Sequence, residues 1–192
     1  MKFRSTFLVL LTASAACAGP FGSPSTAGDV FISAGGDTYA YFVGSTAGYS
    51  NDLHLYSPFV SGILFNNHAA TAGDSVFVGN FTPGTELIFG IFVNDTGETW
   101  KNGPGSRNPD GLVHARVSGW AADGLIPVDG VYVEFEDLDG LPEGAAGYND
   151  LAFVFASVAA TPSVPEPGTI SIAAIALLAG FALRRPLSRG RS

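Results

Sequence analysis

Short apolar runs alternate with clusters of Gly, Asp, Asn and Pro through the middle of the chain, without the spacing of an amphipathic helix. Runs rich in β-branched and aromatic residues between such clusters are typical of strands. They predict seven strands: Thr38–Val43, Gly62–Phe65, Ser75–Val78, Glu86–Val93, Leu112–Val117, Val131–Glu136 and Leu151–Val158. About seven short strands with regular turns favour an all-β fold, an antiparallel β-sandwich of jelly-roll or immunoglobulin-like type.

Three segments between the predicted turns carry more specific patterns. Leu87–Val93 is apolar throughout, which predicts a central strand buried on both faces. Apolar and polar residues alternate at positions 113–118, as in a half-exposed strand. The loop Lys101–Gly111 is long and rich in Gly, Pro and Asn, so we expect a functional or mobile loop there.

The N-terminus predicts a signal peptide over residues 1–18. Lys2 and Arg4 precede the apolar run Phe7–Leu11, and Ala16 and Ala18 complete a small-residue cleavage site for signal peptidase. Lipidation of Cys17 is the alternative, although the usual Leu of a lipoprotein box is missing. If cleavage follows Ala18, the mature protein has no cysteine and therefore no disulfide.

The C-terminus, residues 161–192, has a three-part pattern. A motif at 164–168, with Val164, Pro165, Glu166 and Pro167, precedes an apolar stretch at 170–183 and a basic tail at 184–192. The apolar stretch predicts a hydrophobic helix, but about 14 residues are fewer than the ~20 of a lasting membrane span.

This C-terminal pattern resembles the PEP-CTERM sorting signal. The resemblance implies export through the inner membrane, a transient membrane anchor, and cutting near the motif by an exosortase-type enzyme. The product is then displayed on the cell surface or released outside the cell. An ordinary single-span tail anchor is the alternative reading.

Charge separates the middle of the chain from its ends. In residues 19–165 only three basic residues, Lys101, Arg107 and Arg116, accompany sixteen acidic ones, which gives a net charge of about −13. Such a surface repels phosphate backbones, so nucleic acid is excluded as a partner and cations are the natural ligands. The predicted sandwich domain covers residues 19–160.

The densest chemical signal is the acidic segment at the end of the strand Val131–Glu136. Tyr132, Glu134 and Glu136 should point away from the core, because side chains alternate along a strand. If this strand pairs with Leu151–Val158, the connecting loop brings several oxygen-bearing side chains together. The predicted calcium ligands are Glu136, Asp137, Asp139, Asn149 and Asp150, with Asp110 reaching in from the long loop. A solvated acidic loop without a metal is the alternative.

A second resemblance covers roughly Leu87–Phe155. The segments 136–138 and 148–150, with 108–111 and His114 upstream, look like the domain of unknown function 4114 of bacterial surface proteins. The resemblance implies a β-sandwich and a calcium site, but no known reaction. Ala146 and Gly147 depart from it, because acidic residues often stand there in the family, and one ligand is therefore in doubt.

Further motifs have structural interpretations. Gly48–Leu53 echoes Gly147–Leu151, and we interpret both as Asn-Asp turns that cap a strand. The three histidines have no ligand spacing, so a zinc site is not expected, and a surface or half-buried position is their default. Trp100 and Trp120 are expected to be core or loop anchors.

Two functions remain. The first is a non-enzymatic surface or matrix protein, with exopolysaccharide as a candidate partner. The second is a carbohydrate-active enzyme or carbohydrate-binding module, in which Glu136 and Asp150 would form a carboxylate pair. The sequence shows no nucleophile elbow, phosphate loop or metalloprotease helix, so we expect no enzymatic activity.

Overall fold

The computed structural model describes residues 26–140 and 147–162. The predicted signal peptide (1–18) and hydrophobic helix (170–183) lie outside these residues. The elements are β1 Thr26–Ala27, β2 Val30–Ser33, β3 Gly36–Ser45, β4 Asn51–Ser57, β5 Phe65–Asn66, β6 Ser75–Phe81, β7 Glu86–Val93, β8 Thr99–Lys101, a 3-10 helix Gly105–Arg107, β9 Ala115–Trp120, β10 Gly130–Phe135, β11 Leu151–Phe155 and β12 Val158–Thr161. No helix within the described ranges has the length and apolar character needed to cross a membrane.

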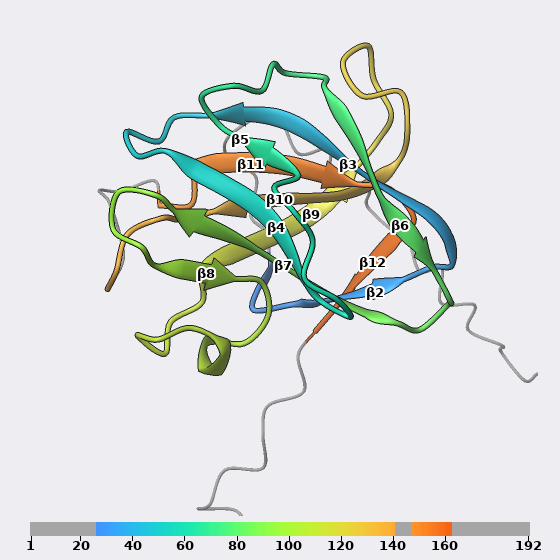
Figure 1. Cartoon of the computed structure of the whole chain (residues 1–192). Coiled ribbons are helices and arrows are strands. Elements are labelled where there is room, and N and C mark those ends of the chain that lie inside the picture. The colour runs from blue at the N-terminus through green and yellow to red at the C-terminus, as the bar shows by residue number, and fades with distance from the viewer. Residues whose placement is uncertain (1–25, 141–146, 163–192) are drawn as a thin grey trace, which may run out of the picture.

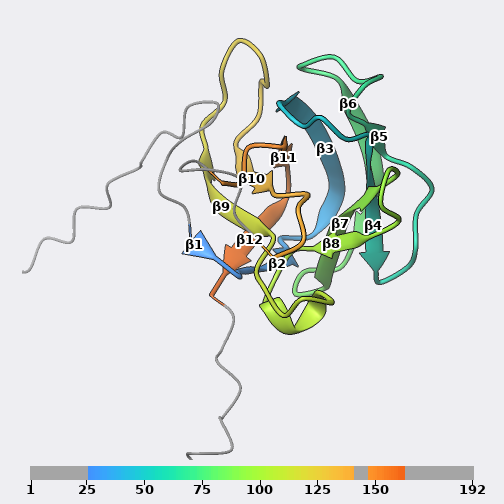
Figure 2. The ribbon, with the colours of Figure 1, turned by 90° about the vertical axis from the view of Figure 1, so that its left-hand side faces the viewer.

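The strands form two antiparallel sheets (Figures 1 and 2). The first sheet has the order β1-β9-β10-β11-β3-β6. The second has the order β12-β2-β7-β4-β5. Strand β8 also pairs with β7 but stands outside this order. The predicted all-β fold of antiparallel strands is thus confirmed, and the two sheets fit a sandwich.

The main core lies between the two sheets and is rich in aromatic rings. Phe89 of β7 stacks on Phe155 of β11 with ring centroids 4.0 Å apart. Phe31 of β2 lies 5.8 Å from the same Phe155 ring. All three side chains are fully buried, so these contacts join the sheets and exclude water between them.

Strand β7 has the predicted bounds and a central position, but only one face is dry. It pairs with β4 along one edge and with β2 and β8 along the other. Its inner side chains are fully buried, whereas Ile88 and Phe92 on the outer face are half-buried. The prediction of two buried faces was therefore wrong. The outer face is covered only locally: a Cβ at Gly90 would lie 2.7 Å from the Trp100 carbonyl oxygen and 3.0 Å from the Tyr56 ring.

Several predicted strands differ from the observed ones. The pattern at Gly62–Phe65 ends in the two-residue strand β5, and the strand predicted from Leu112 begins only at Ala115. The run Leu151–Val158 is two strands, since the chain turns at Ser157, which has a positive φ of 60°. The alternation also missed β2 and β4, both of which lie in the second sheet.

The outer face of the first sheet is less exposed than alternation suggested. Tyr132, Glu134 and Glu136 were expected to point away from the core, but all three are buried. The outer face carries a second apolar cluster: Val43, Trp120, Ile126, Tyr132, Ala152 and Val154. Ile126 belongs to the β9–β10 connection, which therefore folds back over the sheet.

Candidate functional site

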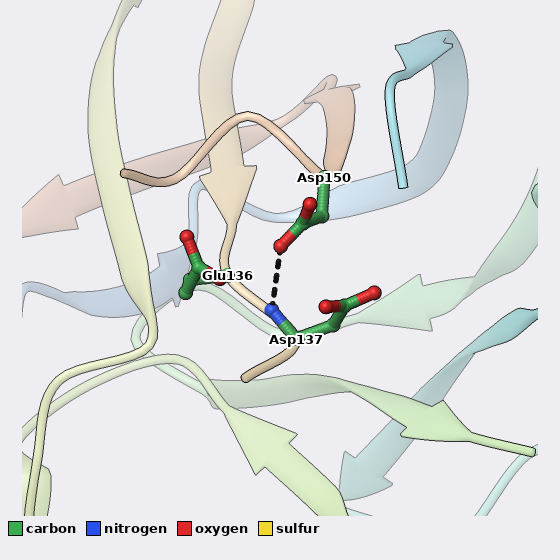
Figure 3. Close-up of side chains that lie close together, drawn as sticks. All are labelled: Glu136, Asp137 and Asp150. Carbon is green, nitrogen blue, oxygen red and sulfur yellow. Dashed lines mark hydrogen bonds between the residues drawn. The ribbon is translucent and has the colours of Figure 1, made fainter. Parts of the chain in front are cut away.

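The hairpin of β10 and β11 builds an acidic triad, which we define as Glu136, Asp137 and Asp150. The two strands pair from Val131↔Phe155 to Phe135↔Leu151, so the residues that follow β10 lie beside the residue that precedes β11. One carboxylate oxygen from each member lies within 4.8 Å of the others (Figure 3). Their exposed fractions are 0%, 3% and 2%, which places the carboxylates away from water.

Amide groups hold the three carboxylates in place. Asp150 Oδ2 accepts a hydrogen bond from the Asp137 backbone N–H at 2.8 Å (Figure 3). Glu136 Oε2 accepts one from the Tyr148 N–H at 2.8 Å, and Asp137 Oδ2 accepts one from Asn51 Nδ2 at 2.7 Å. Tyr148 has a left-handed backbone with φ 66°, an uncommon conformation for a non-glycine residue.

The triad is electrostatically incomplete. Glu136 is fully buried, and its Oε1 has no hydrogen-bond partner among the described residues. Neither Glu136 nor Asp150 forms an ion pair with a described residue. Burial, and secondarily the neighbouring Glu136 carboxyl, raises the pKa of Asp150 to about 6, against the lowering effect of the Asp137 N–H. Near neutral pH these carboxylates repel one another unless a proton or a cation lies between them.

Asp110 lies next to this site but is committed to other partners. Its Oδ2 contacts His114 Nε2 at 2.8 Å and accepts the Gly140 N–H at 3.2 Å, while Oδ1 accepts the Leu112 N–H at 2.9 Å. The pKa of Asp110 is lowered, because these hydrogen bonds outweigh the opposing effect of burial. Its side chain thus stabilises the loop around His114.

Two other predicted ligands lie outside the triad. Asp139 is exposed. Asn149 donates from Nδ2 to Thr46 Oγ1 at 2.8 Å, and the Thr46 hydroxyl donates to the Asn149 carbonyl at 2.6 Å. The structure therefore brings together three of the six predicted ligand side chains.

The sequence did not predict the residues that hold the backbone of the triad in place. His114 is fully buried, so its expected surface or half-buried position was wrong. Its ring stacks on Trp100 at 3.9 Å, and its Nδ1 lies 3.0 Å from the Glu136 carbonyl oxygen. Trp100, a core anchor as predicted, donates from Nε1 to the Asp137 carbonyl at 2.9 Å. This stack fixes the backbone from which two triad carboxylates project.

The long loop at 101–111 is tied to the sandwich by its own polar side chains. Asn102 Oδ1 accepts the Phe89 N–H at 2.8 Å. Asn108 Nδ2 donates to the Leu112 carbonyl at 2.8 Å, and the Arg107 guanidinium pairs with Glu86. These contacts place Asp110 beside His114.

Of the supporting residues, Asn51 had a signal in the sequence. It lies in the segment Gly48–Leu53, which echoes Gly147–Leu151, and both segments lead into a strand, as the turn interpretation expected. The echo does not show that the two segments meet. In the structure both reach Asp137, Asn51 through its side chain and Asp150 through its carboxylate.

Beyond the described residues, the C-terminal segment supplies the decisive comparison. Residues 163–185 match the model of the PEP-CTERM protein-sorting motif. The match confirms the predicted signal and includes Val164–Pro167. A PEP-CTERM motif implies export, a membrane-anchored transit before surface display, and processing by an exosortase-type enzyme. No curated protein and no solved structure matches the chain.

Proposed function

We propose that this PEP-CTERM-bearing chain is a non-enzymatic protein of the cell surface or extracellular matrix, whose β-sandwich binds calcium weakly at the acidic triad. The observation that carries the calcium site is a fully buried Glu136, one oxygen of which has no hydrogen-bond partner within residues 26–140 and 147–162, beside two further buried carboxylates. The resemblance to the domain of unknown function 4114 stays a prediction.

Calcium suits this donor set. It takes six to eight oxygen ligands, mainly from carboxylates, amide and backbone carbonyls and water. Glu136, Asp137 and Asp150 would supply the charged oxygens, and Asp139 follows on the same loop. Asn51, whose Nδ2 donates to Asp137, also has a buried side-chain oxygen to which the described part of the chain donates no hydrogen bond. A bound cation would remove the repulsion between the carboxylates and fasten the end of β10 to the start of β11.

The burial of the triad argues against the enzymatic alternative. A glycosidase places its two carboxyl groups on either side of a bond that substrate must reach, about 5–5.5 Å or 6.5–9.5 Å apart. Glu136 and Asp150 offer oxygens within 4.8 Å and are 0% and 2% exposed. A sugar chain cannot enter between them without opening the hairpin.

The calcium test is thermal unfolding of the full-length chain in a non-ionic detergent, first in chelator and then in millimolar calcium. We expect a dissociation constant of about 10⁻⁴–10⁻³ M, the range of extracellular modules. Calcium at about ten times that constant adds roughly 1.4 kcal/mol to the free energy of unfolding. Magnesium stabilises less, because it requires a tight octahedral shell.

The matched control is the double variant Glu136→Gln plus Asp150→Asn, which keeps the shape of the triad and removes two charges. It should unfold at the same temperature with and without calcium. An unchanged melting temperature of the wild type in calcium would refute the site, as would an equal shift in the double variant.

Export and processing are tested by intact mass of the protein recovered from the host's surface or medium. We expect a product that begins near Gly19, after action of signal peptidase, and lacks the tail beyond the Pro165–Pro167 region. Replacing Pro165, Glu166 and Pro167 by Ala should leave the tail in place. Recovery of the dominant surface form with Ser192 still attached would contradict this processing.

A further inference from the structure

Three aromatic side chains lie together on the outer face of the first sheet, where β3 and β6 pair. Tyr39 and Tyr41 alternate with the core residue Ala40 along β3, and Phe77 of β6 is the register partner of Tyr39. The Tyr39 ring centroid lies 5.4 Å from that of Phe77 and 6.5 Å from that of Tyr41. We call these three residues the aromatic strip.

The aromatic strip is exposed, whereas the neighbouring apolar cluster on the same face is buried. Tyr39 and Phe77 are 37% and 51% exposed. Tyr41 packs against the edge of the apolar cluster that contains Ile126. The strip therefore continues this cluster past the part that the β9–β10 connection covers. Strand β6 ends the sheet order, and Figure 1 shows it as the outermost strand beside β3. Contiguous exposed apolar groups of this kind mark interaction surfaces.

We propose that the aromatic strip binds an uncharged polysaccharide, an assignment that rests on the proposed surface or matrix location. Aromatic faces carry the negative side of the ring quadrupole and so attract the C–H groups of sugar rings. Two residues before Tyr39 on β3, Asp37 is the register partner of Asn80; both are exposed and joined by a 2.7 Å hydrogen bond, and they offer acceptors and a donor to sugar hydroxyls.

Charge disfavours two other kinds of partner. The three Lys and Arg residues of the described chain are all engaged elsewhere: Lys101 lies over Tyr56, Arg107 pairs with Glu86, and Arg116 lies over Tyr148. A polyanion or an anionic membrane therefore finds no unengaged basic side chain among the described residues. The net charge of about −13 over residues 19–165 equally opposes a second copy of the chain.

The test is affinity electrophoresis of the full-length chain in native gels that contain a neutral β-glucan, a mannan or a xylan. A non-ionic detergent without a sugar headgroup avoids competition, and alginate serves as the polyanion. We expect at least one neutral polymer to retard the protein and alginate to have no effect. Replacing Tyr39 and Phe77 together by Ala should weaken the retarding affinity about tenfold, while Tyr39→Trp retains it.

The matched control is Tyr49→Ala, since Tyr49 is also 37% exposed but lies outside the strip. Melting temperatures should be unchanged in all these variants. Retardation by none of the neutral polymers, or by alginate, would overturn the proposal, as would an equal loss in Tyr49→Ala. If replacing Tyr39 and Phe77 by Ala changes the mass in light scattering but not the retardation, the strip is a self-association surface and the proposal is overturned. None of these outcomes alters the calcium-dependent melting, so the two proposals fail independently.

Discussion

The segments Gly48–Leu53 and Gly147–Leu151 share a sequence pattern, yet their aspartates have opposite surroundings. Asp52 accepts hydrogen bonds from two amide side chains, Asn66 Nδ2 at 2.7 Å and Asn94 Nδ2 at 3.0 Å. Among the described residues, the Asp150 carboxylate is given one hydrogen bond, from the Asp137 backbone N–H, and oxygens of the Glu136 and Asp137 carboxylates lie within 4.8 Å of it. Both side chains are buried.

The difference lies in what tertiary structure brings to each turn. Neutral donors from β5 and from the end of β7 complete the shell of Asp52. The end of β10 brings two acids to Asp150 instead. A buried carboxylate with amide donors is stable as it stands, whereas a buried carboxylate among acids requires a proton or a cation. The same local motif is therefore a structural turn in one place and, in our proposal, part of a cation site in the other.

The substitution with the largest expected effect on stability tests whether one core contact stabilises both segments. Phe89 lies on the strand that pairs with β4, and it stacks on Phe155 of β11. Phe89→Ala should lower the free energy of unfolding by about 3–5 kcal/mol, by the same amount in chelator and in calcium. Urea unfolding measures this, with the exposed Phe77→Ala as control. A loss below about 1 kcal/mol would mean that the two segments do not share this core contact.

The second largest effect on the free energy of unfolding should come from protonation of Asp150. The folded state raises the pKa of Asp150 to about 6, so it binds that proton more tightly than the unfolded chain. The resulting stabilisation is complete below the ordinary value of 3.8 and disappears as pH rises through about 6. In chelator the unfolding free energy of the wild type, relative to Asp150→Asn, should therefore fall over this range. Calcium should reverse the trend, since it binds the deprotonated form.

This pH effect is measured by urea unfolding at intervals from pH 4 to pH 7. It is smaller than that of Phe89→Ala because only one group is involved. Parallel profiles of the wild type and Asp150→Asn in chelator would show that Asp150 is not the group that titrates.

The same substitution at the two echoed positions should have opposite signs. Asp52→Asn replaces one acceptor oxygen by an NH₂ group that faces another amide donor, which costs about 1–3 kcal/mol. Asp150→Asn removes a buried charge from a cluster of acids and should stabilise the protein in chelator near neutral pH. Melting temperatures of the two variants measure the difference. If both variants are destabilised, the contrast between the segments is wrong.

The smallest effect concerns the boundary of the acidic triad. Asn149 is committed to Thr46 on the surface, so Asn149→Ala should cost less than about 0.5 kcal/mol and leave the calcium shift intact. Thermal unfolding with and without calcium measures both quantities. Loss of the calcium shift in this variant would extend the site to Asn149, as the sequence predicted.

The sequence indicated those parts of the site that depend on neighbours along the chain. Glu136, Asp137 and Asp150 were predicted together because β10 and β11 flank one loop, and their pairing follows from that connection. Asn51 and Asp137 are 86 residues apart, and no local pattern predicts their contact. Alternation also placed Tyr132 and Glu134 on the correct face but could not show that the face is covered. That cover comes from the connection around Ile126, whose position is set by the whole fold.

The last strand has a consequence for the timing of release. Thr161 at the end of β12 is still the register partner of Val30, and the sorting motif begins at residue 163. The tether from Thr161 to Pro165 therefore reaches at most about 14 Å. While β12 is paired with β2, the processing enzyme has to cut close to a folded domain. When β12 detaches, the segment between the domain and the motif becomes longer by the length of this strand. We expect folding and release to be coupled through this length.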